Sequence, residues 1–278
     1  MHLVCGDKTL DLTRPCVMGI LNVTPDSFSD GGRFHDIGQA LAHAHRMIDE
    51  GAAIIDIGGE STRPGSNPVD IDEELRRVLP LVRSLAPKVS VPISVDTTKP
   101  QVMQAAIDAG AGMINDILAL RTPGAMEAVA ASKVAVCLMH MQGEPRTMQF
   151  EPHYEDVVRE VHEFLRERLD ACEAAGIARN RVVIDPGFGF GKALPHNLSL
   201  LANFDRFLDL GVPVLAGLSR KSMIGTITGR PVDQRLHASV ALATITILKG
   251  ARIIRAHDVA PAVDAVKIVT AILGRDAQ

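Results

Sequence analysis

Short apolar runs alternate with amphipathic segments along most of the chain. Eight of the apolar runs stop where a strand of a parallel sheet would end, and each one leads to a polar residue. The runs are 17–21, 53–55, 93–95, 112–114, 134–138, 181–184, 214–217 and 252–254. The residues at or just beyond their ends are Asn22, Asp56, Asp96, Asn115, Met139 with His140, Asp185, Lys221, and Arg255 with His257.

Between these runs the spacing predicts helices over 37–50, 70–86, 100–109, 155–175, 235–249 and 258–273. Apolar strands that alternate with helices are typical of a parallel sheet in an α/β protein. Eight strands favour a closed eightfold (β/α) TIM barrel, which needs about 250 residues, and residues 1–278 are expected to form this single domain. An open doubly wound sheet is the alternative. Residues 1–14 alternate around Gly6-Asp7-Lys8 and predict an N-terminal β-hairpin.

Composition narrows the class of protein. The net charge is −4, so the sequence predicts no basic surface that would bind nucleic acid. If the protein binds an anion, it must do so at a local cluster of basic residues. No apolar run approaches the roughly 20 residues that a membrane span needs, and no signal peptide is recognised. The four cysteines form no Cys-x-x-Cys pair, which indicates reduced thiols in a cytoplasmic protein.

Because all eight strand ends meet on one face of a parallel barrel, their polar residues are expected to form one site. Asp56, Asp96, Asn115 and Asp185 would give a ring of acceptors for a flat heterocycle rich in N–H groups. The plainer interpretation of Asp56 is a partner for a buried group, and that of Asp185 is a turn former before Pro186.

A second group of residues favours an anion. Arg63 in the segment 58–65, and Arg255 with His257 after the last strand, are suited to phosphate oxygens. Lys221 could form a Schiff base, donate to a carbonyl or remain a solvated cation. Phe190 lies in a glycine-rich turn, where its ring could stack on a ligand.

Several separate motifs occur here in an order that resembles the bacterial dihydropteroate synthases. The resemblance covers nearly the whole chain. Its motifs are 22–32, 58–65, Asp96-Thr97, Asn115-Asp116, Asp185-Pro186-Gly187, Ser219-Arg220-Lys221-Ser222 and Arg255-Ala256-His257-Asp258.

The resemblance implies an enzyme that condenses 6-hydroxymethyl-7,8-dihydropterin diphosphate with 4-aminobenzoate. Pyrophosphate leaves and 7,8-dihydropteroate forms, through a dissociative, SN1-like step of folate synthesis that sulfonamides inhibit. The implied pterin ligands are Asp56, Asp96, Asn115, Met139, Asp185, Phe190, Gly217 and Lys221. The implied diphosphate ligands are Asn22, Thr62, Arg63, Arg255 and His257, with Mg²⁺ held through Asn22; Phe28, Pro64 and Ser222 would border aminobenzoate. The residues with catalytic roles would be Asp30, Arg63, Lys221, Arg255 and His257.

Three other functions are compatible with parts of this pattern. A pterin-dependent methyltransferase domain would share the acidic pocket but would not need Thr62-Arg63 or Arg255 with His257. A Schiff-base aldolase would use Lys221 but leaves the acidic ring unexplained, and a pterin-binding sensor would release no pyrophosphate. The helix over 235–249 is apolar nearly all round, which, with the resemblance, predicts a homodimer.

Overall fold

The computed structural model describes residues 1–23, 32–60, 68–144 and 147–274. Within these ranges eight parallel strands form one sheet in the order β8-β7-β6-β5-β4-β3-β10-β9. A bridge between Ile184 and Val214 joins the two edges, so the sheet closes on itself. The TIM barrel is therefore confirmed, and the open doubly wound alternative is wrong. The strands are β3 (Cys16–Asn22), β4 (Ile54–Gly58), β5 (Ile93–Asp96), β6 (Met113–Asp116), β7 (Ala135–Met139), β8 (Val182–Asp185), β9 (Leu215–Ala216) and β10 (Ile253–Ala256).

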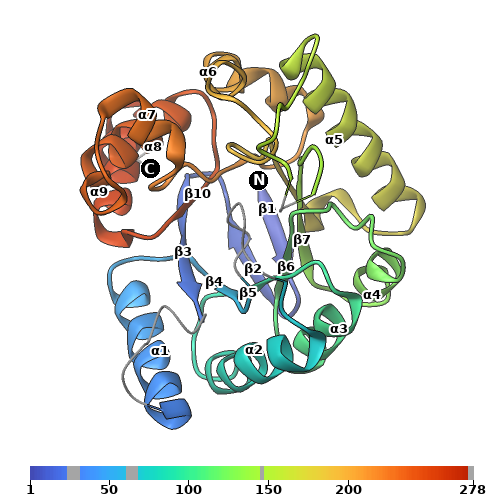
Figure 1. Ribbon diagram of the computed structural model, residues 1–278. Helices are drawn as coiled ribbons and strands as arrows, with labels where there is room; N and C mark the ends of the chain where they lie inside the picture. The colour runs from blue at the N-terminus through green and yellow to red at the C-terminus, as the bar shows by residue number, and fades with distance from the viewer. Residues whose placement is uncertain (24–31, 61–67, 145–146, 275–278) are drawn as a thin grey trace.

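Helices surround this barrel on the outside (Figure 1). They are α1 (Gly32–Asp49), α2 (Ile71–Leu85), α3 (Pro100–Asp108), α4 (Ala125–Ala130), α5 (Val157–Ala174), α6 (Leu194–Ala202), α7 (Ser222–Thr228), α8 (Leu236–Leu248) and α9 (Val259–Ile272), with short 3₁₀ turns η2 (Arg179–Arg181), η3 (Phe204–Leu210) and η4 (Val232–Gln234). The side chain of Asp70 caps α2 by accepting a hydrogen bond from the Glu73 amide at 2.7 Å. This is the start that the sequence predicts.

Three helices, α4, α6 and α7, are not predicted from the sequence. Each has nine residues or fewer. The residues that precede them, Gly124, Ala193 and Lys221, make no side-chain capping bond. A polar cap and a long apolar period are the main sequence signals of a helix, and these segments carry neither. They could therefore not be recognised as helices from the sequence.

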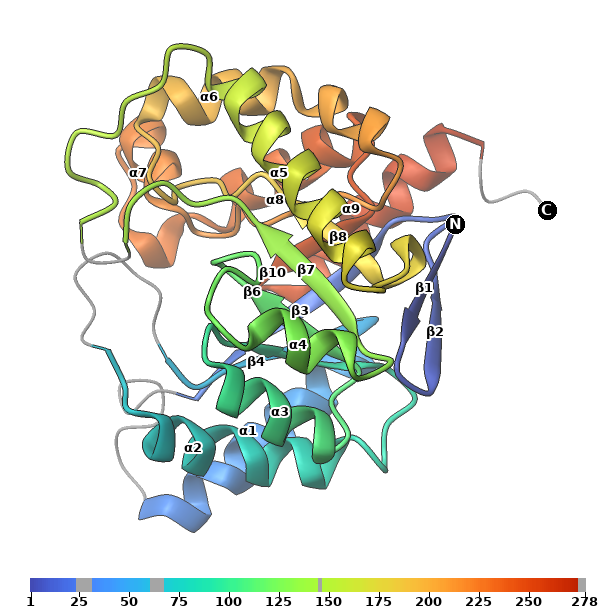
Figure 2. The same cartoon turned by 90° about the vertical axis from the view of Figure 1, so that its right-hand side faces the viewer.

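The N-terminal hairpin is confirmed as β1 (His2–Cys5) and β2 (Lys8–Asp11), which pair antiparallel. It lies at the end of the barrel opposite to the one toward which β7 runs (Figure 2). Its apolar side chains Leu3 and Cys5, with Leu12 after it, are fully buried against Met18 and Ile54 of the barrel interior. The hairpin therefore plugs the bottom of the barrel and leaves the other end for the site.

The barrel interior changes from apolar to polar along the strands. Ile54 in β4 and Met113 in β6 belong to the buried cluster at the bottom. Two residues further on, which is the next position on the same face of a strand, stand Asp56 and Asn115. The polar residues thus form a layer at the carboxyl ends of the strands, directly above the apolar core.

Candidate active site

Three strands bring a cation and two carboxylates together at the top of the barrel. Arg255 in β10 donates from Nε to Asp56 Oδ2 at 2.6 Å and from a terminal nitrogen to Asp96 Oδ2 at 2.8 Å. Asn115 Nδ2 donates to the same Asp56 oxygen at 3.1 Å. Burial raises the pKa of the Asp96 carboxyl to about 7, although the Arg255 guanidinium opposes this shift. The acceptor ring expected from the sequence is therefore formed for these residues.

Arg255 makes two contacts that the sequence does not predict. The sequence predicts Arg255 beside Arg63 and His257 on an anion, and Arg63 lies outside the described residues. The Arg255 guanidinium pairs with the Asp56 and Asp96 carboxylates, which the sequence assigns to the heterocycle ring. This pairing gives Asp56, which has no exposed side-chain surface, a charged hydrogen-bond partner inside the barrel. Asp56 is thus the partner of a buried group, as its plainer interpretation holds.

Asp185 and Lys221 form the second part of the site. Asp185 ends β8, is buried, and accepts a hydrogen bond from the Gly187 amide at 2.7 Å. Burial raises its pKa. Its other carboxylate oxygen faces Gly217, where a Cβ would come within 3.7 Å of it. The strand end at residue 217 therefore leaves open the space beside the carboxylate.

The ammonium group of Lys221 lies against the glycine-rich turn that follows β8. Its Nζ donates to the Phe188 carbonyl at 2.6 Å and stands 4.0 Å from the centre of the Phe190 ring. Burial lowers the pKa of Lys221 to about 8, and the Asp185 carboxylate limits this shift. Lys221 is therefore held among a ring face, a carbonyl and a carboxylate, rather than in solvent.

Met139 supplies the apolar wall of this region. It ends β7, is buried, and packs with Ile117, Met141 and Met148. Phe190 packs against the same cluster. Met139 and Phe190 thus belong to one apolar cluster at this end of the barrel.

His257 and Asn22 lie at the ends of β10 and β3, which are neighbours in the barrel. Ser219 contacts His257 twice: its hydroxyl accepts from the His257 amide at 3.2 Å and lies 3.1 Å from Nδ1. Ser219 belongs to one of the sequence motifs, but the sequence predicts no role for it, because a serine in a loop carries no signal of this contact. Ser222 is exposed and begins α7. Phe28, Asp30, Thr62, Arg63 and Pro64 lie outside the described residues.

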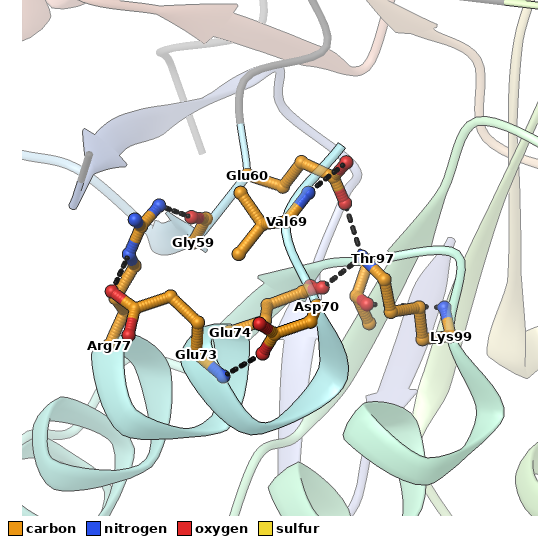
Figure 3. Close-up of polar contacts among 9 residues, drawn as sticks. All are labelled: Gly59, Glu60, Val69, Asp70, Glu73, Glu74, Arg77, Thr97 and Lys99. Carbon is orange, nitrogen blue, oxygen red and sulfur yellow. Dashed lines mark hydrogen bonds and ion pairs between the residues drawn. The ribbon is translucent and has the colours of Figure 1, made fainter. Parts of the chain in front are cut away.

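A cluster of ion pairs holds the two ends of the segment that contains Thr62, Arg63 and Pro64 (Figure 3). Glu60, after β4, accepts a hydrogen bond from the Val69 amide at 3.1 Å and also pairs with Lys99. Lys99 contacts the fully buried Glu74 of α2 at 2.5 Å. Arg77 donates to the Gly59 carbonyl at 2.8 Å. This cluster was missed from the sequence, where the acidic start of α2 indicates only a favourable helix terminus.

Comparison with known proteins agrees with this geometry. The family model described as pterin binding enzyme matches residues 18–257. The dihydropteroate synthase of Escherichia coli strain K12 is 52% identical over 273 residues, which cover 98% of this chain and 97% of that protein. The chain belongs to the pterin-binding enzyme family and, within it, to the dihydropteroate synthases.

Solved structures of this family superpose closely on the chain. A Yersinia pestis dihydropteroate synthase in complex with a sulfonamide drug has 52% identity and a TM-score of 0.94, and covers 99% of this chain and 100% of its own. A Xanthomonas albilineans synthase in complex with 7,8-dihydropteroate has 51% identity and a TM-score of 0.89, with 98% and 99% covered. These relatives are synthases, so membership does not favour the methyltransferase alternative. No helix of the described residues has the length and apolar character of a membrane span.

Proposed function

We propose that this dihydropteroate synthase joins 4-aminobenzoate to 6-hydroxymethyl-7,8-dihydropterin diphosphate and releases pyrophosphate and 7,8-dihydropteroate, in folate synthesis. One observation carries the proposal beyond family membership. Buried acceptors on three strands, Asp96, Asn115 and Asp185, share one end of the barrel with the partly dehydrated cation Lys221. The Xanthomonas relative with 7,8-dihydropteroate supports the same reaction.

The pterin ring is proposed to bind above the apolar core. Asp185 keeps one carboxylate oxygen beside Gly217, where it can accept from the amino–imino edge of the ring. Lys221 donates to the pterin carbonyl without forming a covalent intermediate. Asp96 and Asn115 form hydrogen bonds with the remaining edge of the pterin ring. Met139 and Phe190 pack against the faces of the ring. Asp56 acts indirectly, because it holds Arg255 and Asn115 from below.

The diphosphate is proposed to meet Asn22, Thr62, Arg63, Arg255 and His257. Arg255 then links the two halves of the site, since its charge is shared between the carboxylates below it and the anion above.

Mg²⁺ is the proposed metal. Mg²⁺ binds in many sites through few protein ligands, with substrate phosphates and water as the others. The side-chain oxygen of Asn22 fits that role: it lies 3.5 Å from where a Cβ at Gly58 would stand, so the glycine keeps the space beside it clear. Bound there, Mg²⁺ supplies charge neutralisation to the leaving pyrophosphate.

The residues then act in a dissociative substitution. The bond between the pterin methylene carbon and the diphosphate oxygen breaks, and its electron pair leaves with pyrophosphate. Arg63, Arg255 and His257 stabilise that growing charge, and Asp30 stabilises the cation left on the carbon. The neutral amine of 4-aminobenzoate, bordered by Phe28, Pro64 and Ser222, forms the new C–N bond and loses a proton to pyrophosphate.

Two variants test the two halves of the site separately. Asp185→Asn should weaken binding of unphosphorylated 6-hydroxymethyl-7,8-dihydropterin by about tenfold or more, because it replaces a buried acceptor of charge −1. Arg63→Ala should lower turnover on the order of 10²-fold while pterin affinity is retained. Release of pyrophosphate and dihydropteroate is measured with both substrates and Mg²⁺. Normal turnover in both variants would refute these assignments.

A homodimer in the cytoplasm completes the proposal. On the outer helices α8 and α9, which pack together (Figure 1), large apolar side chains are exposed: Ile245 (40%), Leu248 (53%), Ile268 (61%) and Ile272 (71%). A second copy would cover them. Cys5, Cys16, Cys137 and Cys172 are free thiols, as a reducing compartment favours. A monomer mass by light scattering at micromolar concentration would contradict the dimer.

A further inference from the structure

Lys192 is a buried cation that the proposed reaction does not use. It follows the glycine-rich turn after β8 and is only 2% exposed. Lysine is among the residues least often buried, because its charge is costly to remove from water. A lysine in this place therefore needs a set of partners that offsets this cost.

The partners of Lys192 are three backbone carbonyl oxygens and one imidazole nitrogen. Its Nζ lies 2.9 Å from the Gly187 carbonyl oxygen and 3.0 Å from that of Phe190. On the other side it lies 2.9 Å from His140 Nδ1 and 3.3 Å from the His140 carbonyl oxygen. The side-chain amino group of Lys192 therefore has a hydrogen-bond partner on both segments that it separates.

The state of His140 agrees with this arrangement. Burial and the charge of Lys192 lower the pKa of His140 to about 2. The imidazole is therefore neutral at physiological pH, and Nδ1 is able to accept. Burial lowers the pKa of Lys192 well below its usual value, and the Asp185 carboxylate opposes this shift.

Lys192 joins two segments that both supply the pterin pocket. Its His140 contacts hold the residue directly after Met139 at the end of β7. Its Gly187 and Phe190 contacts hold the turn that presents the Phe188 carbonyl and the Phe190 ring to Lys221. The two segments are in close backbone contact: a Cβ at Gly187 would lie 1.9 Å from the His140 carbonyl oxygen. No Cβ fits at that contact, and the hydrogen bonds of Lys192 span the two backbones beside it.

We infer that Lys192 is a positioning residue for pterin binding: the hydrogen bonds of its side-chain nitrogen fix the turn of residues 187–190 against the end of β7, and this places Phe190 and the partner carbonyl of Lys221. The inference rests on the pterin pocket proposed above. Lys192 touches no substrate in this assignment. Its contribution lies in the geometry of groups that do.

The test replaces Lys192 with methionine, which keeps the length of the side chain but removes its charge and all its donors. The dissociation constant of unphosphorylated 6-hydroxymethyl-7,8-dihydropterin is measured by calorimetry and expressed per folded active site. We expect Lys192→Met to raise it by about tenfold or more. A merely structural role would lower the folded fraction and leave that constant unchanged. Lys192→Arg, which keeps the charge, should recover part of the affinity.

The chain offers a matched control at the other end of the barrel. Arg181, just before β8, is also a partly buried cation that donates to backbone carbonyls, those of Val134 and Val129 at 2.9 and 2.8 Å. Arg181→Met should destabilise the fold and leave pterin affinity unchanged. If Lys192→Met does not fold, Lys192→Gln, which keeps an amide donor, takes its place with the same expectation.

The outcomes separate this inference from the proposed pocket. If Asp185→Asn and Lys221→Met weaken pterin binding but the Lys192 variants do not, the positioning role is wrong and the pocket stands. If none of these substitutions changes pterin affinity, the pocket itself is wrong. If Arg181→Met weakens binding as much as Lys192→Met, the effect is general destabilisation and the inference is overturned.

Discussion

The pairing of Arg255 with Asp56 and Asp96 makes a prediction about stability that depends on pH. The Arg255 side chain is 21% exposed, and its partners are 0% and 9% exposed. Removing one partner of a buried ion pair leaves an uncompensated charge and typically costs about 3–5 kcal/mol. We expect Arg255→Met to lower the free energy of unfolding by about that amount at alkaline pH.

The pH dependence follows from Asp96. The pKa of Asp96 in the folded protein is about 7, because burial raises it and Arg255 lowers it. Without Arg255 this folded-state pKa moves higher. The pKa of Asp96 in the unfolded chain is unchanged. Well below pH 7 the carboxyl is protonated with or without Arg255, so this part of the stabilisation is absent. It appears as pH rises through 7. At pH 8.5, one and a half pH units above that pKa, it amounts to about 2 kcal/mol.

The measurement is urea unfolding of both proteins at pH 5.5, 7.0 and 8.5. Circular dichroism is the suitable signal, since the chain has no tryptophan and one tyrosine. Arg220→Met is the control, because Arg220 pairs with Asp258 at the same end of the barrel but is 37% exposed, and such exposed pairs contribute about 1 kcal/mol or less. Equal losses for Arg255→Met at pH 5.5 and 8.5, or a loss no larger than that of Arg220→Met, would refute the reasoning.

Two further predictions concern the pocket. The affinity for unphosphorylated dihydropterin should fall as pH rises above about 8, because Lys221, whose pKa is lowered to about 8, then loses the proton that makes it a charged donor. In Lys221→Arg the fall in affinity should move to higher pH. A fall at the same pH in this variant would argue against the role of Lys221. Gly187→Ala should lower the melting temperature by about 10 °C or more, since a Cβ there meets the His140 carbonyl at 1.9 Å and φ is +71°. Gly176→Ala, at φ +85° with nothing within 4 Å, should cost about 1–2 kcal/mol, or roughly 2–8 °C; equal effects on melting would contradict the packing argument.

The positions of Asp96, Asn115 and Asp185 were predictable because one rule of geometry covers them. Parallel strands of a barrel end on the same face, so a polar residue at a strand end must reach that face. The rule applies strand by strand and needs no knowledge of neighbours. The fold and the acceptor ring followed from it.

The partners within the ring were not predictable in the same way. Arg255 in β10 reaches Asp56 in β4 and Asp96 in β5, which are two and three strands away around the barrel. No periodicity along the chain specifies contacts across a closed barrel. Lys192 was missed for a different reason: the sequence predicts a glycine-rich turn beside a ligand but gives no sign that this lysine is buried, which only the four partners around its Nζ show.

The same strands separate stability from function along their length. Their first halves contribute side chains such as Ile54 and Met113 to a buried apolar cluster, and burial of each such side chain stabilises the fold by about 1.5–3 kcal/mol. Their last residues are charged or polar, and their burial is costly unless they are paired. The site can hold several buried carboxylates for two reasons. Arg255, Lys192 and Lys221 lie among them, and the apolar layer below offsets the remaining free-energy cost of their burial. A substitution at a strand end that keeps the local charge balance should therefore affect substrate binding more than folding. A substitution that changes this balance should affect both.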